Sequence, residues 1–176
     1  MGLADLLVSL AVLSLVMSTN LTLVQQGWRA YAVGSARVEA QQSARIALQR
    51  MARDIRSAGA GTATIGFDAV SLAEPARIVF HRDVNVDGVA VGRRETITWK
   101  LDRDVLRRDA GGGAQPIVTG VRALAFTYLD ARGELTAAAA NVRAVRITLT
   151  VAATNAASPG ADVAATVSTQ VRLRNR

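Results

Sequence analysis

The sequence predicts an α+β protein in which one long N-terminal helix precedes a small antiparallel β-sheet domain. Residues 6–28 carry no charged side chain, and residues 35–58 have the periodicity of an amphipathic helix. Runs rich in β-branched residues then follow one another from residue 77 onward. No proline occurs before Pro75, so the pattern is consistent with a single helix over residues 1–58.

The first part of this helix, residues 1–28, is expected to be the half that lies in a membrane. The uncharged run from Leu6 to Trp28 is longer than the ~20 residues with which a helix crosses a bilayer. A secretory signal peptide would have a basic segment before the apolar run, whereas here only Asp5 and the α-amino group are charged. An ordinary membrane anchor stays open, although it gives no reason for a carboxylate at Asp5.

The second part, residues 29–58, is expected to be the amphipathic half of the helix. Apolar residues recur there at spacings of four, three and four, which places them on one stripe that should pack on the following domain. The residues of this core stripe are Ala44, Leu48, Met51 and Ile55. A continuous helix over 1–58 would be about 87 Å long. Glycines end the helix, and residues 59–76 are expected to form a glycine-rich linker.

Residues 77–176 are expected to form the antiparallel globular domain, with roughly four to six strands in one sheet. Five runs combine β-branched residues with alternation of apolar and polar side chains. These runs are 77–82, 95–101, 121–130, 142–152 and 163–176. The segment 130–133, with sequence DARG, has the composition of a turn between two strands.

The order of these features resembles the type IV pilin superfamily. The first ten residues, MGLADLLVSL, align without a gap to the FTLIELLVAL typical of mature pilins. In this alignment Asp5 takes the place of the usual glutamate and Met1 that of the methylated first residue, so the chain resembles a mature, leader-free prepilin. The segments ALQRMARDIRSAG, RDVNVDG, VRALAFTYLDARGEL and TVSTQVRLRN are similar to PilW-type minor pilins and to the related GspJ-type minor pseudopilins of type II secretion.

The resemblance implies a structural subunit of a type IV pilus, placed at or near the filament tip, that helps to prime assembly. Its partners would be other major and minor pilins, contacted through the helix residues Leu6, Leu7, Leu10 and Leu13, and the assembly platform of the inner membrane. The subunit would wait in the bacterial inner membrane and then enter an extracellular filament, or a periplasmic pseudopilus. The alternatives are a minor pseudopilin of a type II secretion system and a membrane-anchored binding domain that does not polymerise.

For Asp5, the resemblance implies an ion pair with the α-amino group of Met1 on a neighbouring subunit. Such a contact would neutralise two groups that are otherwise buried unpaired, and it would set the axial register of the filament. The alternative is a carboxylate that simply lies at the membrane surface. There the positive end of the helix dipole stabilises it.

Residues 83–88, with sequence DVNVDG, match the first half of an oxygen-ligand calcium loop. Gly88 stands where such loops turn sharply, but Arg94 occupies the twelfth position, where a glutamate is expected, and Glu95 follows it. The candidate ligands are the side chains of Asp83, Asn85, Asp87 and Glu95 and the carbonyl of Val89. The alternative is a polar hairpin turn, because Asn, Asp and Gly favour turns in any case. An ion here would be structural, and no other cofactor is expected.

The composition gives little support to catalysis or to nucleic-acid binding. The chain has no cysteine, one histidine, no GxSxG motif and no phosphate-binding loop, so we expect no enzyme. Its 21 basic and 14 acidic residues give a net charge of +7, but the arginines are scattered rather than clustered. A DNA-binding tail at Arg172, Arg174 and Arg176 is the alternative to an exposed strand end.

Overall fold

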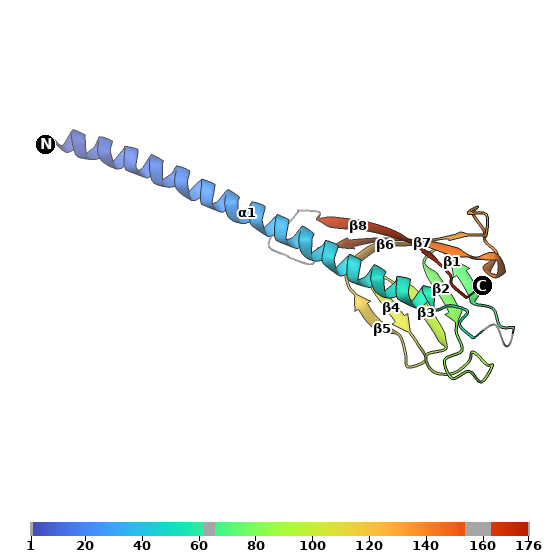
Figure 1. Cartoon of the computed structure of the whole chain (residues 1–176). Helices are drawn as coiled ribbons and strands as arrows, with labels where there is room; N and C mark the ends of the chain where they lie inside the picture. Colours follow the sequence, from blue (N-terminus) through green and yellow to red (C-terminus); the bar gives the residue numbers. More distant parts are fainter. Residues whose placement is uncertain (1, 62–65, 154–162, 176) are drawn as a thin grey trace.

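The computed structural model describes residues 2–61, 66–153 and 163–175, and it confirms the predicted α+β class (Figure 1). The helix α1 runs from Leu3 to Arg56, 54 residues or about 81 Å, and its N-terminal half projects away from the domain (Figure 1). The helix therefore passes without interruption from the apolar to the amphipathic part of the sequence. Met1 and Arg176, both candidate site residues, lie outside the described residues.

The described strands form two antiparallel sheets, so the expectation of one sheet with four to six strands is wrong. The first sheet has five strands in the order β1-β2-β3-β4-β5, and the second has three in the order β6-β7-β8. The first consists of β1 (Val70–Glu74), β2 (Arg77–His81), β3 (Thr96–Asp102), β4 (Val105–Asp109) and β5 (Gln115–Val118). The second consists of β6 (Val121–Leu129), β7 (Ala144–Ala152) and β8 (Ala164–Arg172), and the short helix η1 (Ala139–Asn141) precedes β7.

Three of these strands were not predicted, and each lacks a local signal. The strand β1 lies inside the segment 59–76 that was expected to be a glycine-rich linker. β4 follows β3 through a tight turn in which Arg103 has φ 56°, a conformation that hairpin turns usually give to Asn or Gly. β5 is an edge strand that contains Pro116, a residue that is typical of edges because it cannot donate a ladder hydrogen bond.

The C-terminal half of α1 packs against the two sheets and forms one continuous core with them. All four residues of the stripe are buried, and Met51 and Ile55 have no exposed surface. They lie among Phe80 and Trp99 of the first sheet and among the apolar residues of β7. This packing joins the C-terminal half of the helix to the domain, and the other half has no partner among the described residues.

Candidate functional sites

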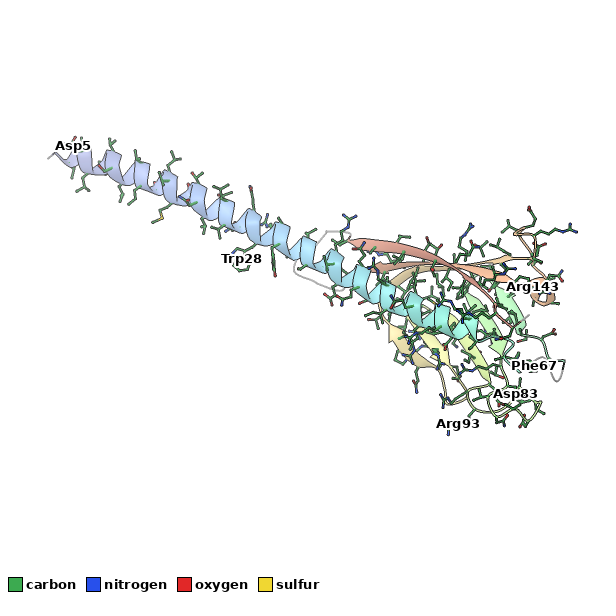
Figure 2. All side chains as sticks on the ribbon, viewed as in Figure 1. Asp5, Trp28, Phe67, Asp83, Arg93 and Arg143 are labelled. Carbon is green, nitrogen blue, oxygen red and sulfur yellow. The ribbon has the colours of Figure 1, made fainter. Side chains whose placement is uncertain are left out.

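The projecting half of α1 exposes a long row of large apolar side chains. Its predicted packing residues Leu6, Leu7, Leu10 and Leu13 are each more than half exposed. The helix contains an 18-residue window with a mean hydropathy of 2.0, none of which is buried, so it is long and apolar enough to cross a membrane. This surface suggests a membrane anchor or a signal sequence. Figure 2 shows side chains standing out along the projecting helix between Asp5 and Trp28.

Six polar side chains between residues 9 and 22 are satisfied by the helix backbone. Each donates a hydrogen bond of 2.7–2.8 Å to a carbonyl three or four residues earlier. The donors are Ser9, Ser14, Ser18, Thr19, Asn20 and Thr22. Because an unsatisfied polar group is costly in hydrocarbon, these bonds make the segment compatible with lipid or with apolar helix packing.

Asp5 caps the N-terminus of α1. Its Oδ2 accepts a hydrogen bond of 3.0 Å from the backbone N–H of Gly2, which precedes the first turn. Gly2 has no side chain, so the reciprocal contact of a full capping box is absent. The carboxylate also lies in the first turn, where the helix dipole favours a negative charge. The other oxygen, Oδ1, makes no hydrogen bond to a described residue, so the carboxylate can accept a further donor.

The predicted calcium loop folds around two buried carboxylates. Asp83 is 7% exposed; its Oδ1 accepts the N–H of Val86 at 2.7 Å and its Oδ2 that of Gly88 at 2.9 Å. Glu95 is 3% exposed and accepts the N–H groups of Val84 and Gly92. Gly88 has φ 87°, which is the left-handed conformation that the sharp turn required.

Asp83, Asp87 and Glu95 come together into a triad that could hold a metal ion. One carboxylate oxygen from each lies within 4.8 Å of the other two, and Asp87 is exposed while its two partners are buried. Carboxylate oxygens suit a hard cation such as calcium. The Asn85 side chain instead bonds to Asp87, donating to Oδ2 at 2.7 Å and accepting its N–H at 3.2 Å. Asn85 would therefore have to turn before it could serve as a ligand.

Arg82, which immediately precedes the loop, contacts the end of α1 and the segment before β3. Arg82 donates from Nη1 to the hydroxyl of Ser57 at 3.0 Å and from Nε to the carbonyl of Arg94 at 2.8 Å. Burial, together with the charges of Arg108 and Arg94, lowers the pKa of Arg82, and the charge of Asp54 opposes this. The guanidinium thus links the helix end to the loop. Figure 2 shows Asp83 and Arg93 at the end of the domain remote from Asp5.

A polar contact between α1 and the first sheet was not predicted from the sequence. Asp54 accepts hydrogen bonds from Arg108 Nε at 2.7 Å and from Trp99 Nε1 at 3.1 Å. The side chains of the Arg108–Asp54 pair are only 17% and 14% exposed. The sequence signal was the carboxylate itself, because an acid in the last turn of a helix opposes the helix dipole unless a cation compensates it.

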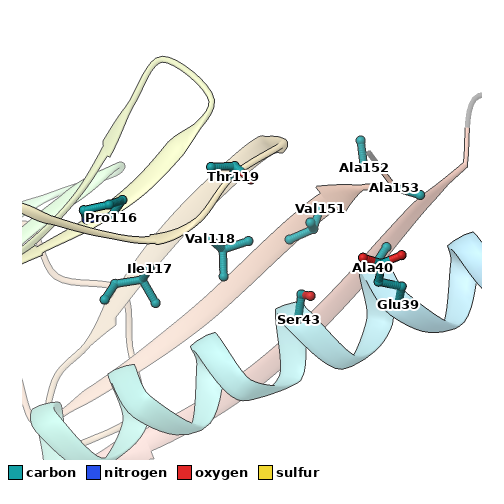
Figure 3. Close-up of a pocket in the computed structure, with 10 residues that line it drawn as sticks. All are labelled: Glu39, Ala40, Ser43, Pro116, Ile117, Val118, Thr119, Val151, Ala152 and Ala153. Atoms are coloured by element: carbon teal, nitrogen blue, oxygen red, sulfur yellow. The ribbon is translucent and has the colours of Figure 1, made fainter. Parts of the chain in front are cut away.

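The remaining candidates do not assemble into a site. Arg172 and Arg174 are exposed at and just beyond the end of β8. A cavity of about 390 Å³ opens between the helix and the ends of β5 and β7 (Figure 3). Its lining is mostly apolar and small, with Glu39 as its only charged side chain, so it offers no constellation for chemistry.

The chain was also compared with known proteins. No family model matches it, and a search of curated proteins finds no match. The likeness to pilins therefore rests on architecture: a long apolar N-terminal helix that packs on antiparallel sheets is a pilin-like fold.

Proposed function

We propose that the chain is a minor pilin, a structural subunit of a type IV pilus that is incorporated at or near the filament tip and helps to prime assembly. The observation that carries this proposal is the projecting half of α1, which is apolar, fully exposed and continuous with a helix that is buried on the domain. Such a half is stable only in lipid or among other apolar helices. A subunit with this shape can therefore exchange the inner membrane for a bundle of pilin helices without refolding.

Asp5 sets the axial register in this proposal. Within one subunit it already accepts the Gly2 N–H through Oδ2. Its charge and its remaining acceptor sites are then available to the α-amino group of Met1 on a neighbouring subunit, as the resemblance to pilins implies. Leu6, Leu7, Leu10 and Leu13 supply the surrounding contacts. The helix buries roughly the same apolar area in lipid as in the helix bundle, so this burial does not drive assembly in one direction. In this proposal the assembly platform supplies that direction, and the ion pair sets the axial position of the subunit.

The proposal is tested by substituting Asp5 in the native cells and measuring incorporation into sheared filaments. Asp5→Ala should leave the sheet domain folded but reduce incorporation severely. Asp5→Asn keeps an acceptor for the Gly2 N–H while it removes the charge, and Asp5→Glu restores the charge. We expect the Asp5→Asn variant not to be incorporated into filaments and the Asp5→Glu variant to recover at least part of the incorporation. Normal incorporation of the Asn variant would show that capping, not ion pairing, is the role of Asp5.

Two related functions share the same architecture. A minor pseudopilin of a type II secretion system would assemble in the periplasm, and an anchored binding domain would not polymerise. Deletion of the gene distinguishes a pseudopilin from a pilin. Loss of protein secretion would indicate a pseudopilin, whereas loss of surface filaments would indicate a pilin. Mass spectrometry of the N-terminal peptide separates both from a plain anchor, because a methylated peptide starting at Met1 marks a processed pilin-like subunit. In every case we propose a structural rather than a catalytic role, with no role for DNA.

We also propose that the acidic triad binds calcium as a structural ion. The favouring observation is the approach of three carboxylates, two of them buried, within 4.8 Å. Calcium at about 100 times its dissociation constant should raise the thermal midpoint by about 5–10 °C. Asp87→Asn removes the exposed ligand with little harm to the fold, and Asp104→Asn is its control. Absence of a calcium-dependent shift in the wild-type protein would contradict the site.

A further inference from the structure

A groove runs between one face of α1 and the strand β8. It has a volume of about 610 Å³. Its lining residues are Arg45, Leu48, Gln49, Ala52, Arg53 and Arg56 of α1 and Val167, Ser168 and Thr169 of β8. We call it the arginine groove, because its described lining contains three arginines and no carboxylate. Leu48 and Ala52 are 5% exposed and form an apolar floor, while the arginines are exposed.

The strand β8 presents its backbone edge to this groove. Successive side chains of a strand point to opposite faces of the sheet. Three consecutive residues of β8, 167–169, line the groove, which places the groove along the edge of the strand. Among the described residues β8 pairs only with β7, which leaves its other edge without a ladder partner.

This edge differs from the other sheet edges of the protein. β1 and β6 each carry an irregularity in their pairing, and β5 contains Pro116, devices that natural sheets use to prevent unwanted strand addition. β8 pairs regularly over nine residues, and from 164 to 171 it contains no charged residue and no proline. Among the described edges β8 therefore lacks these devices, and its unpaired edge borders the groove beside α1.

We propose that the arginine groove binds an acidic, extended segment of a partner protein, which adds to β8 as a further antiparallel or parallel strand. Backbone hydrogen bonds to β8 would give the segment its position, and carboxylates would meet the arginines. On α1, Arg45 and Arg56 are about 16 Å apart along the axis, the length of about five strand residues. Acidic residues at alternate positions of a five- to six-residue segment therefore face the three arginines.

Peptide is the occupant that this surface favours over nucleic acid. Sequence-tolerant binding of single strands depends on aromatic side chains on which bases stack, and the lining contains none. An open strand edge, in contrast, offers alternating N–H and C=O groups that only another extended backbone matches. The proposal does not depend on filament assembly, since the groove belongs to the folded domain and not to the projecting helix.

The test measures binding of a fluorescent peptide, acetyl-TEVEVET-amide, to the full chain in detergent micelles by fluorescence anisotropy. The double variant Arg53→Gln/Arg56→Gln should raise the dissociation constant about fivefold or more. The matched control Arg37→Gln/Arg50→Gln changes the net charge equally at exposed helix positions outside the groove, and it should bind as the wild type does.

A second pair of probes tests the strand edge itself. Two peptides of the same sequence carry N-methyl groups on alternate backbone amides. In one peptide the odd-numbered amides are methylated, and in the other the even-numbered amides. One of them should lose binding and the other should keep it, because only one set of N–H groups faces β8 in a ladder. Equal binding of both peptides, equal loss in the two arginine variants, or binding of a single-stranded DNA oligonucleotide but not of the peptide would each overturn the proposal.

Discussion

The two halves of α1 belong to one continuous helix, but the N-terminal half is exposed and the C-terminal half is packed on the domain. Met17 in the projecting half is 65% exposed, whereas Met51 in the other half has no exposed surface. In the projecting half Thr19, Asn20 and Thr22 donate hydrogen bonds to backbone carbonyls one turn earlier in the same helix. In the other half Asp54 reaches across to the first sheet. The comparison teaches that the residues that stabilise the domain and the apolar surface that stays exposed lie on separate stretches of one element.

This separation has a consequence for folding. The C-terminal half gains its stability from tertiary packing, so it should unfold together with the sheets as one unit. The projecting half has only its helical hydrogen bonds and its surroundings, lipid or other helices, to maintain it. Substitutions in the two halves should therefore report on different equilibria, and matched pairs of substitutions can test this directly.

The largest expected effect comes from truncating the same residue type in each half. Met51→Ala should lower the free energy of unfolding of the domain by about 2–5 kcal/mol, because it leaves a cavity in the core. Met17→Ala should leave it unchanged. Urea denaturation in micelles, followed by the fluorescence of Trp99 in a Trp28→Phe background, measures both. An equal loss of stability in the two variants would mean that the halves unfold as one unit.

The next effect concerns the polar contact that fixes the end of the helix to the first sheet. Asp54→Ala should cost about 1–3 kcal/mol, because Arg108 and the Trp99 indole N–H lose their acceptor in a largely buried place. The exposed Arg107–Asp102 pair, with side chains 31% and 41% exposed, is the control. Asp102→Asn should change the same unfolding curve by less than about 0.5 kcal/mol. Reversal of this order would contradict the structural role of Asp54.

The sequence predicted the parts of the fold that have a local period. The uncharged run, the helical stripe and five of the strands follow directly from spacing and composition, since each is a property of neighbouring residues. The division into two sheets is not such a property, because it depends on which edges pair across long stretches of chain. β4 was missed since Arg103 takes a turn conformation that favours other residue types.

The candidate sites divide in the same way. The alternation of Asp83, Asn85 and Asp87 and the turn at Gly88 were visible in the sequence, and the loop does bring carboxylates together. The reorientation of Arg82 toward Ser57 was not visible, because the two residues meet only after the helix end and the loop have packed. The arginine groove depends on the place of β8 beside α1, which no local pattern indicates.

A smaller effect, of opposite sign, is expected in the projecting half. Gly27 lies within α1, and a Cβ added there would meet no atom within 4 Å. Gly27→Ala should stabilise the helix locally by about 1 kcal/mol, because glycine has the poorer helix propensity. Ala30→Gly should have the opposite effect. Amide hydrogen exchange around these positions in detergent measures both, and the urea curve of the domain should not move in either variant.

The smallest effect lies at the opposite end of the molecule from Asp5, in the exposed turn after β6. Asp130 accepts the N–H groups of Arg132 at 2.8 Å and of Glu134 at 3.0 Å. These bonds, with the nearby charge of Arg132, lower the pKa of Asp130 below its ordinary value of 3.8. A carboxyl whose pKa is lower in the folded than in the unfolded state stabilises the folded state at pH values above its unfolded-state pKa. This stabilisation is lost as the pH falls through the folded-state pKa.

Acidification should accordingly loosen the turn only below pH 3.8, while the buried half of α1 keeps its hydrogen-exchange protection. An NMR titration of the Asp130 carboxyl and of the Arg132 and Glu134 amides measures this midpoint. Asp130→Asn keeps an acceptor oxygen for the turn but cannot titrate, so the pH-dependent shifts of those amides should vanish. A midpoint at or above 3.8 in the wild-type protein would show that these backbone bonds do not favour the charged form.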